Sequence, residues 1–325
     1  MQEPHSTTGI SPAPMDVHEV CVIMPNMLAH IGVQGAVTKT LLRDADPCWV
    51  FLGCLLPDVP WILQRLGHAF VPGINAYDLR LYTMIQASLA ACILLCGALA
   101  LYSSQPWKIF RVLALNAVLH LLLDACETKW GNGVHLFAPF SWKLLNFRLF
   151  WPESWLILLL TIFGLAYGVR AWWHVPPPLL FATLRPAWQR WCATLLIVAY
   201  VVLPMAFRNG PYAMDNHSVK TLQERDLRTG RLVEFDRNLY LKQPLGDYVR
   251  TFAGEELRVT GKQSAHSGLV SIRAIFVDPT TIHIEALHTH WGASRDVASY
   301  LGLALLVVLW LRPYIQRTRG CRNTL

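Results

Sequence analysis

Residues 109–126 read IFRVLALNAVLHLLLDAC, an almost wholly apolar run of 18 residues that carries Arg111 near its start and His120 and Asp124 near its end. Coiled as a helix, the run spans about 27 Å, close to the roughly 30 Å hydrocarbon core of a bilayer. Its length and character predict a transmembrane helix. The run therefore decides the class of fold that the rest of the chain must fit.

The composition of the whole chain agrees with a membrane protein, because 54% of the residues are hydrophobic and only 15% are charged. Three further runs are long enough to cross a bilayer: Leu79 to Tyr102, Trp155 to Trp173 and Trp191 to Phe207. A shorter fifth run, from Val297 to about Trp310, has Tyr300, Trp310 and Tyr314 as interfacial anchors. The sequence predicts a mainly α fold, a multi-pass transmembrane helical bundle.

The N-terminal segments are less regular. Trp49 to Leu66 is apolar except for a polar and proline-rich set, namely Pro57, Asp58, Pro60, Gln64 and Arg65. Because lipid disfavours that content, we expect a broken or re-entrant helix that packs against protein and lines a wet cavity. Met27 to Leu42 is expected to form a short helix. Residues 1–23 lack the basic start and apolar core of a secretory signal, and we expect a disordered tail there.

Basic residues in the short connections predict the orientation. Three sets fall on one side if all five runs cross: Lys108 and Arg111; Arg170, Arg185 and Arg190; and Arg312, Arg317, Arg319 and Arg322. Lys and Arg favour the cytoplasmic side, so the C-terminus is expected in the cytoplasm. The loop from Glu127 to Glu153 and the segment after Phe207 are then expected outside.

Residues 24–207 are expected to form a helical membrane domain, and residues 297–325 the last helix with its basic tail. Between them, residues 208–296 are the only segment whose sequence predicts a soluble domain. Alternating stretches predict short antiparallel strands: Arg231 to Arg237, Glu256 to Thr260, Leu269 to Val277 and Thr281 to His288. The segments LKQPLGD, GKQSAHSG and VDPTT are expected to be turns. We expect a small extramembrane β-domain of five or six strands, for which a barrel is one arrangement.

Charge and cysteine content narrow the partners and the cell compartment. Asn209 to Asp296 has 11 basic and 11 acidic residues, so the net charge of +7 comes from the rest of the chain, where many basic residues flank the apolar runs. This favours contact with lipid head groups and gives no support to nucleic-acid binding. The protein partner of the β-domain stays undefined. Six cysteines lie in apolar surroundings without a CxxC pair and are interpreted as small hydrophobes: Cys48, Cys54, Cys92, Cys96, Cys126 and Cys192.

His120 and Asp124 are the clearest chemical signal, because a spacing of four places both on one face of a helix. An ionisable pair inside a membrane is costly, which favours a functional role such as metal ligation. The alternative is a hydrogen bond that pins two helices together. Asp58, in LLPDVP, is a second carboxylate inside an apolar run, with helix capping or another purely structural role as its alternative. His30, in MLAHIG, is either a further ligand or a satisfied core histidine. Such a mixed set suits a divalent ion such as Zn²⁺ in a catalytic site.

The order of these motifs resembles a known family. MLAH with His30, GCLLPDVP with Asp58, and HLLLD with His120 and Asp124, followed by ETKWGNGVHLFAPFSW, are similar to the membrane-bound metal-dependent hydrolases over residues 24–150. Bacterial relatives of that family include a LexA-binding inner-membrane protein, and the family is similar to zinc-dependent phospholipase C. The resemblance implies that His30, Asp58, His120 and Asp124 are metal ligands, and that the protein lies in the bacterial inner (plasma) membrane.

The chain departs from the family at one position. Members carry a histidine in a segment like RGxTHS before the second long helix, where this chain reads AYDLRLYTMIQASL. Three alternatives are open: His68 substitutes as a ligand, Gln86 or Asp78 takes the space, or the site is degenerate and non-catalytic.

Residues after the HLLLD motif offer further candidates. Glu127 and His135 are predicted to act as acid and base or as extra ligands, with a solvated loop as the alternative. The aromatic residues around Pro139–Trp142, with Trp151 and Trp155, are expected to be an interfacial anchor. His288 and His290 share one strand face, which favours a solvated face over a second metal site.

These observations predict a membrane-bound metal-dependent hydrolase that acts on a phosphoester in a lipid or lipid-linked substrate at the outer membrane surface. The rival hypothesis is a non-catalytic membrane protein that binds or relays metal ions or protons and uses its β-domain to bind a partner.

Overall fold

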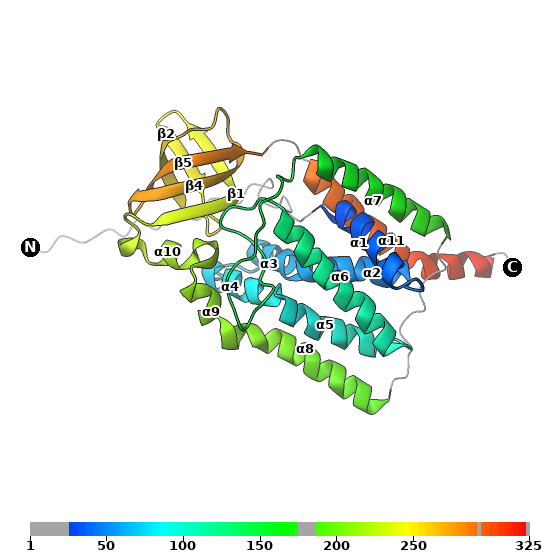
Figure 1. The fold of residues 1–325 in the computed structure, drawn as a ribbon. Coiled ribbons are helices and arrows are strands. Elements are labelled where there is room, and N and C mark those ends of the chain that lie inside the picture. The colour runs from blue at the N-terminus through cyan, green and yellow to red at the C-terminus, as the bar shows by residue number, and fades with distance from the viewer. Residues whose placement is uncertain (1–25, 175–185, 291–293, 323–325) are drawn as a thin grey trace, which may run out of the picture.

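The computed structural model describes residues 26–174, 186–290 and 294–322, and within them a helical part carries a small β-barrel at one end (Figure 1). The expected tail at 1–23 lies outside the described residues. The helical part begins with α1 (Met27–Leu41), whose N-terminus is capped by the Asn26 side chain accepting from the Ala29 amide. The mainly α class with a β-domain before the last helix is confirmed.

The predicted broken helix forms three pieces: α2 (Pro47–Leu55), a 3-10 turn η2 (Leu56–Asp58) and α3 (Val59–Phe70). Pro57 and Pro60 lack the amide hydrogens that a continuous helix would need, so the pattern of backbone hydrogen bonds is interrupted between α2 and α3. Asp58 precedes α3, but its side chain makes no capping hydrogen bond. Helix capping is therefore not the role of this carboxylate.

The prediction of one continuous helix from Leu79 to Tyr102 is wrong. The segment forms α4 (Ala76–Gln86) and α5 (Leu89–Leu101), which meet at an angle of 66°. The Ser88 side chain accepts a hydrogen bond from the Ala91 amide and starts α5 afresh. A serine side chain that caps a helix replaces the regular backbone hydrogen bonds at that point. The sequence does not reveal the break, because the residues on both sides of it are apolar.

The remaining long helices are α6 (Pro106–Cys126), α7 (Trp155–His174), α8 (Ala187–Phe207) and α11 (Ser294–Arg322). Within the described residues, four helical segments are long and apolar enough to cross a membrane, or five if the bent α4–α5 pair counts as one. The four are Pro47–Phe70, Pro106–Cys126, Trp155–Trp173 and Ala187–Ala213. Segments α7 and α8 expose large apolar side chains along their length, including Leu158, Ile162, Leu195 and Met205. Such surfaces suit lipid rather than water.

The segment after α8 starts with short helical turns rather than strands: α9 (Asn209–Ala213), η3 (Asn216–Ser218), α10 (Val219–Gln223) and η4 (Arg225–Leu227). Five strands follow in the described part: β1 (Leu232–Gln243), β2 (Gly246–Arg250), β3 (Glu256–Gly261), β4 (Gly268–Asp278) and β5 (Thr281–Thr289). They close into a barrel in the order β1-β2-β3-β5-β4, with β3 and β5 parallel and every other pair antiparallel.

The alternation seen in the sequence explains the barrel, because inward residues such as Val233, Phe235, Ile272 and Ile282 are buried. The alternating pattern predicts that the first strand ends at Arg237, and it does not reveal β2. A break in register between Phe235 and Asn238 interrupts the alternation there, and β1 then continues to pair with β2 through Gln243. The segment LKQPLGD is therefore mostly strand, with a tight turn at its centre.

The loop between α6 and α7 joins the barrel to the helices. The Gly131 amide donates to Glu234 on β1 at 2.8 Å, and Asn132 Nδ2 donates to Asp236 at 3.3 Å. From the helical side, the Tyr77 ring of α4 packs edge-on against Phe252 at 5.5 Å. These contacts hold the barrel against the first turn of α4 and the loop that follows α6.

Candidate metal centre

Three separate segments bring the predicted ligands together. His30 comes from α1, Asp58 from the turn η2, and His120 and Asp124 from consecutive turns of α6. The His30 and His120 rings stack with centroids 4.2 Å apart. The two histidines and Asp58 are buried, with exposed fractions of 4% or less. The four residues that the motif order singled out thus form one cluster.

Close helix packing places His30. Helix α1 crosses α7 where Gly32 faces Gly164, and a side chain on Gly164 would overlap the carbonyl oxygen of Leu28. The glycines allow the two backbones to touch, which presses the opposite face of α1 toward α6. Asn116, one turn before His120, accepts from Thr38 Oγ1 at 3.3 Å and ties the other end of α1 to α6.

His120 has the geometry of a ligating imidazole. Its Nδ1 lies 2.6 Å from the Cys54 carbonyl oxygen, so Nδ1 carries the proton and donates it. In the neutral ring Nε2 then holds a lone pair, and it lies 3.5 Å from Asp58 Oδ1 and 3.7 Å from Asp124 Oδ2. Among the described residues, this buried nitrogen has no hydrogen-bond partner. A backbone acceptor on one ring nitrogen and a free second nitrogen are typical of metal-bound histidine.

His30 completes the cluster from the other side. Its Nε2 lies 3.4 Å from Asp124 Oδ1, and its Nδ1 lies 2.9 Å from the side-chain nitrogen of Gln34. As placed, the Gln34 amide donates to Nδ1, which leaves the proton on Nε2. A rotation of the amide would bring Oε1, which is buried and has no partner among the described residues, to Nδ1. Nε2 would then be free to bind a metal.

The spacing of these groups fits a divalent ion. Two ligands bound at about 2.1 Å to a tetrahedral zinc ion lie about 3.4 Å from each other. The three contacts measure 3.4, 3.5 and 3.7 Å, longer than ordinary hydrogen bonds and close to that ligand spacing. His30, His120 and Asp124 each offer one atom within 4.8 Å of the others. Oδ2 of Asp58 is also buried without a hydrogen-bond partner within the described part of the chain.

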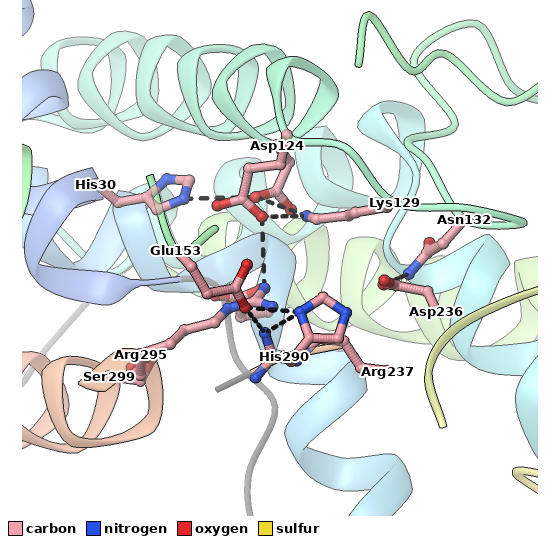
Figure 2. Close-up of polar contacts among 12 residues, drawn as sticks. His30, Asp124, Lys129, Asn132, Glu153, Asp236, Arg237, His290, Arg295 and Ser299 are labelled. Atoms are coloured by element: carbon pink, nitrogen blue, oxygen red, sulfur yellow. Dashed lines mark hydrogen bonds and ion pairs between the residues drawn. The ribbon is translucent and has the colours of Figure 1, made fainter. Parts of the chain in front are cut away.

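Lys129 and Arg295 balance the carboxylates around the cluster. Figure 2 follows the contacts from His30 through Asp124 to Lys129, whose Nζ lies 3.2 Å from Asp124 and 3.3 Å from Glu127. Burial opposes the charge on Lys129, but these two carboxylates raise its pKa. Arg295, in the first turn of α11, lies 3.5 Å from Glu127 Oε2. Glu127 is thus held between two cations.

A cavity of about 560 Å³ opens between the cluster and the barrel. Asp58 and Asp124 line it, whereas His30 and His120 lie behind them. His135 lines it as well, is 4% exposed, and has no hydrogen-bond partner on either ring nitrogen among the described residues. Burial lowers the pKa of His135 to about 4, so the ring is neutral at neutral pH.

The structure places the other predicted site residues as follows. The alternative of a solvated loop is wrong for Glu127 and His135, because each is only 4% exposed. Glu127 does not line the large cavity, whereas His68 does. Within the described ranges, His68 is not part of a group of three residues that could hold a metal. Gln86 donates to Tyr82 at 3.3 Å and Asp78 pairs with Arg208 at 2.6 Å, so neither joins the cluster.

His288 and His290 do not form a solvated face, which corrects the sequence analysis. His288 stacks on Trp151 with centroids 3.6 Å apart, and His290 is only 2% exposed. His290 lies 2.6 Å from Glu153 through Nδ1 and 2.8 Å from Ser271 Oγ through Nε2. The alternation of polar and apolar residues in β5 could not reveal that the loop with Trp151 and Glu153 covers His290.

His288, His290 and Glu153 lie close enough together to hold a metal ion. Arg237 lies 3.2 Å from Glu153, however, and both nitrogens of His290 already have partners. Glu153, Arg237 and His290 are therefore interpreted as a set of polar contacts that joins the barrel to the loop between α6 and α7 (Figure 2).

The aromatic loop is divided between two roles. Phe140 and Trp155 are 97% and 73% exposed, as an interfacial anchor requires. Trp151 instead packs on His288, and Trp142 lies against His135 at 5.8 Å between ring centroids.

Sequence reasoning missed Gln34, Lys129 and Arg295. Gln34 follows His30 by four residues, so the shared helix face was a usable signal. Lys129 follows Asp124 by five residues in a loop, and Arg295 approaches from the far end of the chain. Their positions depend on packing that no local pattern records.

No protein-family model matches this chain, and no curated protein and no solved structure matches it.

Proposed function

We propose that this protein is a membrane-bound metal-dependent hydrolase that acts on a phosphoester of a lipid or lipid-linked substrate. The observation that carries the proposal is the group of buried, unpartnered ligand atoms on His120 and Asp58 beside Asp124, at the base of a cavity. Buried polar atoms without partners are costly, and a bound cation would offset that cost. The order of motifs from His30 to Asp124 and its resemblance to the hydrolase family support the same conclusion.

The proposed setting is the bacterial inner (plasma) membrane, with the C-terminus in the cytoplasm and the barrel outside. The long apolar helices and the basic residues in their connections support this orientation. Asp124 lies near the end of α6 that faces the barrel, so the site would open at head-group depth. Lipid substrates would reach it by lateral diffusion.

His120, Asp124 and Asp58 would hold the ion, with His30 as a fourth ligand. Zinc fits this mixed imidazole and carboxylate set. When bound, such an ion lowers the pKa of a coordinated water and polarises a phosphoryl oxygen. Because the carboxylates line the cavity and the imidazoles lie behind them, the substrate would approach from the side of Asp58 and Asp124.

His135 is the proposed proton acceptor. It is neutral, faces the cavity and has both ring nitrogens without a partner in the described part of the chain. Glu127 is paired with Lys129 and Arg295, so we assign it a positioning role. It would hold Lys129 next to Asp124 and so limit how much negative charge the ligand set carries.

The rival is a protein that relays protons through the same residues without turnover. A proton on His120 Nε2 would lie between Asp58 and Asp124, at 3.5 and 3.7 Å. These distances exceed those of ordinary charge-assisted hydrogen bonds, about 2.7–2.9 Å, and favour ligation over a relay.

Metal analysis of the detergent-purified protein separates the two hypotheses. The wild type should carry a stoichiometric divalent ion and cleave a chromogenic phosphodiester, and a chelator should abolish the cleavage. His120→Ala should lose both, whereas Arg111→Ala, at an exposed position on the same helix, should lose neither. Bound metal without turnover would favour the rival, and absence of metal from the wild type would contradict the metal site.

A further inference from the structure

The wall of the large cavity is strongly basic. Among the described residues that line it are six cations and three carboxylates, namely Arg65, Arg80, Lys129, Arg237, Arg250 and Arg295 against Asp58, Asp124 and Asp236. Two of those carboxylates are the proposed metal ligands, so a bound divalent ion would make the cavity more positive still. Like charges repel strongly in a partly desolvated space, and an anionic ligand would offset that repulsion.

Arg80 on α4 is held rigidly in this wall. Its guanidinium lies over the Trp61 ring at 4.9 Å and over the Phe252 ring at 5.1 Å. Burial, and then the charge of Arg80, keep the pKa of His217 well below its usual range, so His217 is neutral and accepts from Arg80 Nη2 at 2.9 Å. Nε of Arg80 is buried and has no partner among the described residues. The side chain is therefore fixed while one donor remains unused.

Arg237 and Arg295 approach the same cavity from β1 and α11. They are 4% and 7% exposed, and each pairs with one carboxylate, Glu153 at 3.2 Å and Glu127 at 3.5 Å. Nε of both, and Nη1 of Arg295, are buried donors without a partner within the described ranges. Burial, and next the positive charge of Arg295, lower the pKa of Arg237. The two guanidinium groups, both labelled in Figure 2, therefore keep N–H donors that their protein partners do not use.

These three arginines belong to both structural parts of the molecule. Arg80 and Arg295 come from helices and Arg237 from the barrel, and all line the cavity that Asp58 and Asp124 also line. Guanidinium groups match phosphate oxygens because several N–H donors point in one plane. Buried arginines with unused donors are typical of sites that bind phosphate rather than of surface ion pairs.

We propose that Arg80, Arg237 and Arg295 form a subsite for a phosphate group of the substrate other than the one at the metal. The inference rests on the proposed function and deepens it: the substrate carries a diphosphate or a second phosphorylated group. It also assigns the barrel a part in substrate binding. The phosphate can belong to a lipid head group or to a soluble compound.

The test measures binding of inorganic pyrophosphate to the detergent-purified full chain by calorimetry, with a chelator present and ionic strength matched with sodium chloride. Wild type should bind, and Arg80→Gln and Arg237→Gln should each weaken binding by about tenfold or more, as expected for lost hydrogen bonds between charged groups. Arg258→Gln, at an exposed barrel position away from the cavity, should bind like wild type. Equal affinity in all four proteins would overturn the subsite.

Two controls keep this result separate from the proposed function. His120→Ala should retain pyrophosphate binding in chelator although it loses metal and turnover, so failure of the hydrolase leaves this measurement intact. If Arg237→Gln unfolds, Arg80→Gln decides the outcome, because it leaves the ion pair between Arg237 and Glu153 intact. Competition by phosphatidic acid micelles, and none by phosphatidylcholine, would assign the phosphate to a lipid. Competition by neither would assign it to a soluble compound.

Discussion

Replacing Gln34 by Met tests whether His30 is a metal ligand. Gln34 is fully buried and its side chain lies 2.9 Å from His30 Nδ1. Met has a similar volume and no strong hydrogen-bonding group, so the packing should change little while the contact to the ring is lost. Loss of such a supporting hydrogen bond typically lowers metal affinity by about 10–100-fold, which corresponds to about 1.4–2.7 kcal/mol.

The assay is competition for zinc between the purified protein and a fluorescent chelator. Gln34→Met should bind zinc about 10–100-fold more weakly than wild type. Gln34→Glu offers only acceptors, so it should fix the proton on Nδ1 and bind at least as tightly as wild type. Gln105→Met, an exposed glutamine at the start of α6, is the matched control and should show no change. Equal zinc affinity for Gln34→Met and wild type, or equal weakening by Met and Glu, would refute the assigned role of His30.

Three other variants test the fold and its electrostatics. Burial lowers the pKa of His135 to about 4 from its ordinary 6.5, so the unfolded chain binds the proton first. Stability should be full above about pH 6.5 and fall by at most about 3 kcal/mol as the pH drops toward 4. Thermal unfolding over this range should show a smaller loss for His135→Gln, and an equal loss would contradict the assignment. Gly164→Leu should separate α1 from α7 through Leu28 and lower both the melting temperature and the zinc affinity, whereas Ala166→Leu on the exposed face should lower neither. Arg228→Met should destabilise the chain by about 3–5 kcal/mol, because fully buried Arg228 binds Glu255 at 2.9 and 2.7 Å. Arg225→Met removes a largely exposed guanidinium that pairs with the same Glu255 at 3.2 Å, so it should cost under about 1 kcal/mol in chemical unfolding, and equal costs for the two variants would contradict this account.

Local patterns were sufficient for several features of the fold. The apolar runs correctly placed α6, α7 and α8, because helices of this length need only an apolar surface on most sides. The spacing of His120 and Asp124 correctly put both on one face of α6, and alternation found four of the five strands in the described barrel. Local patterns failed where a capping side chain or a register break interrupts an otherwise regular run, as at Ser88 and after Phe235.

Identification of the candidate site depended on both the sequence motifs and the tertiary structure. The order of the motifs in the sequence groups His30, Asp58, His120 and Asp124, and the structure brings them together. The burial of His135 and the pairing of Glu127 with Arg295 were not predicted, because an isolated loop sequence looks solvated whatever covers it. The covered His290 shows the same limit.

The sequence by itself determined which segments are apolar enough to be long helices, which form strands, and which helix face carries His120 and Asp124. Periodicity records these features because each depends on neighbours one or two turns away. Only the tertiary structure decided that η2 meets α6 through Asp58 and His120, and that β1 of the barrel adds Arg237 to a cavity lined by Asp124. A repeating pattern states that a face is buried, but the identity of the surface that buries it follows from the packing of distant segments.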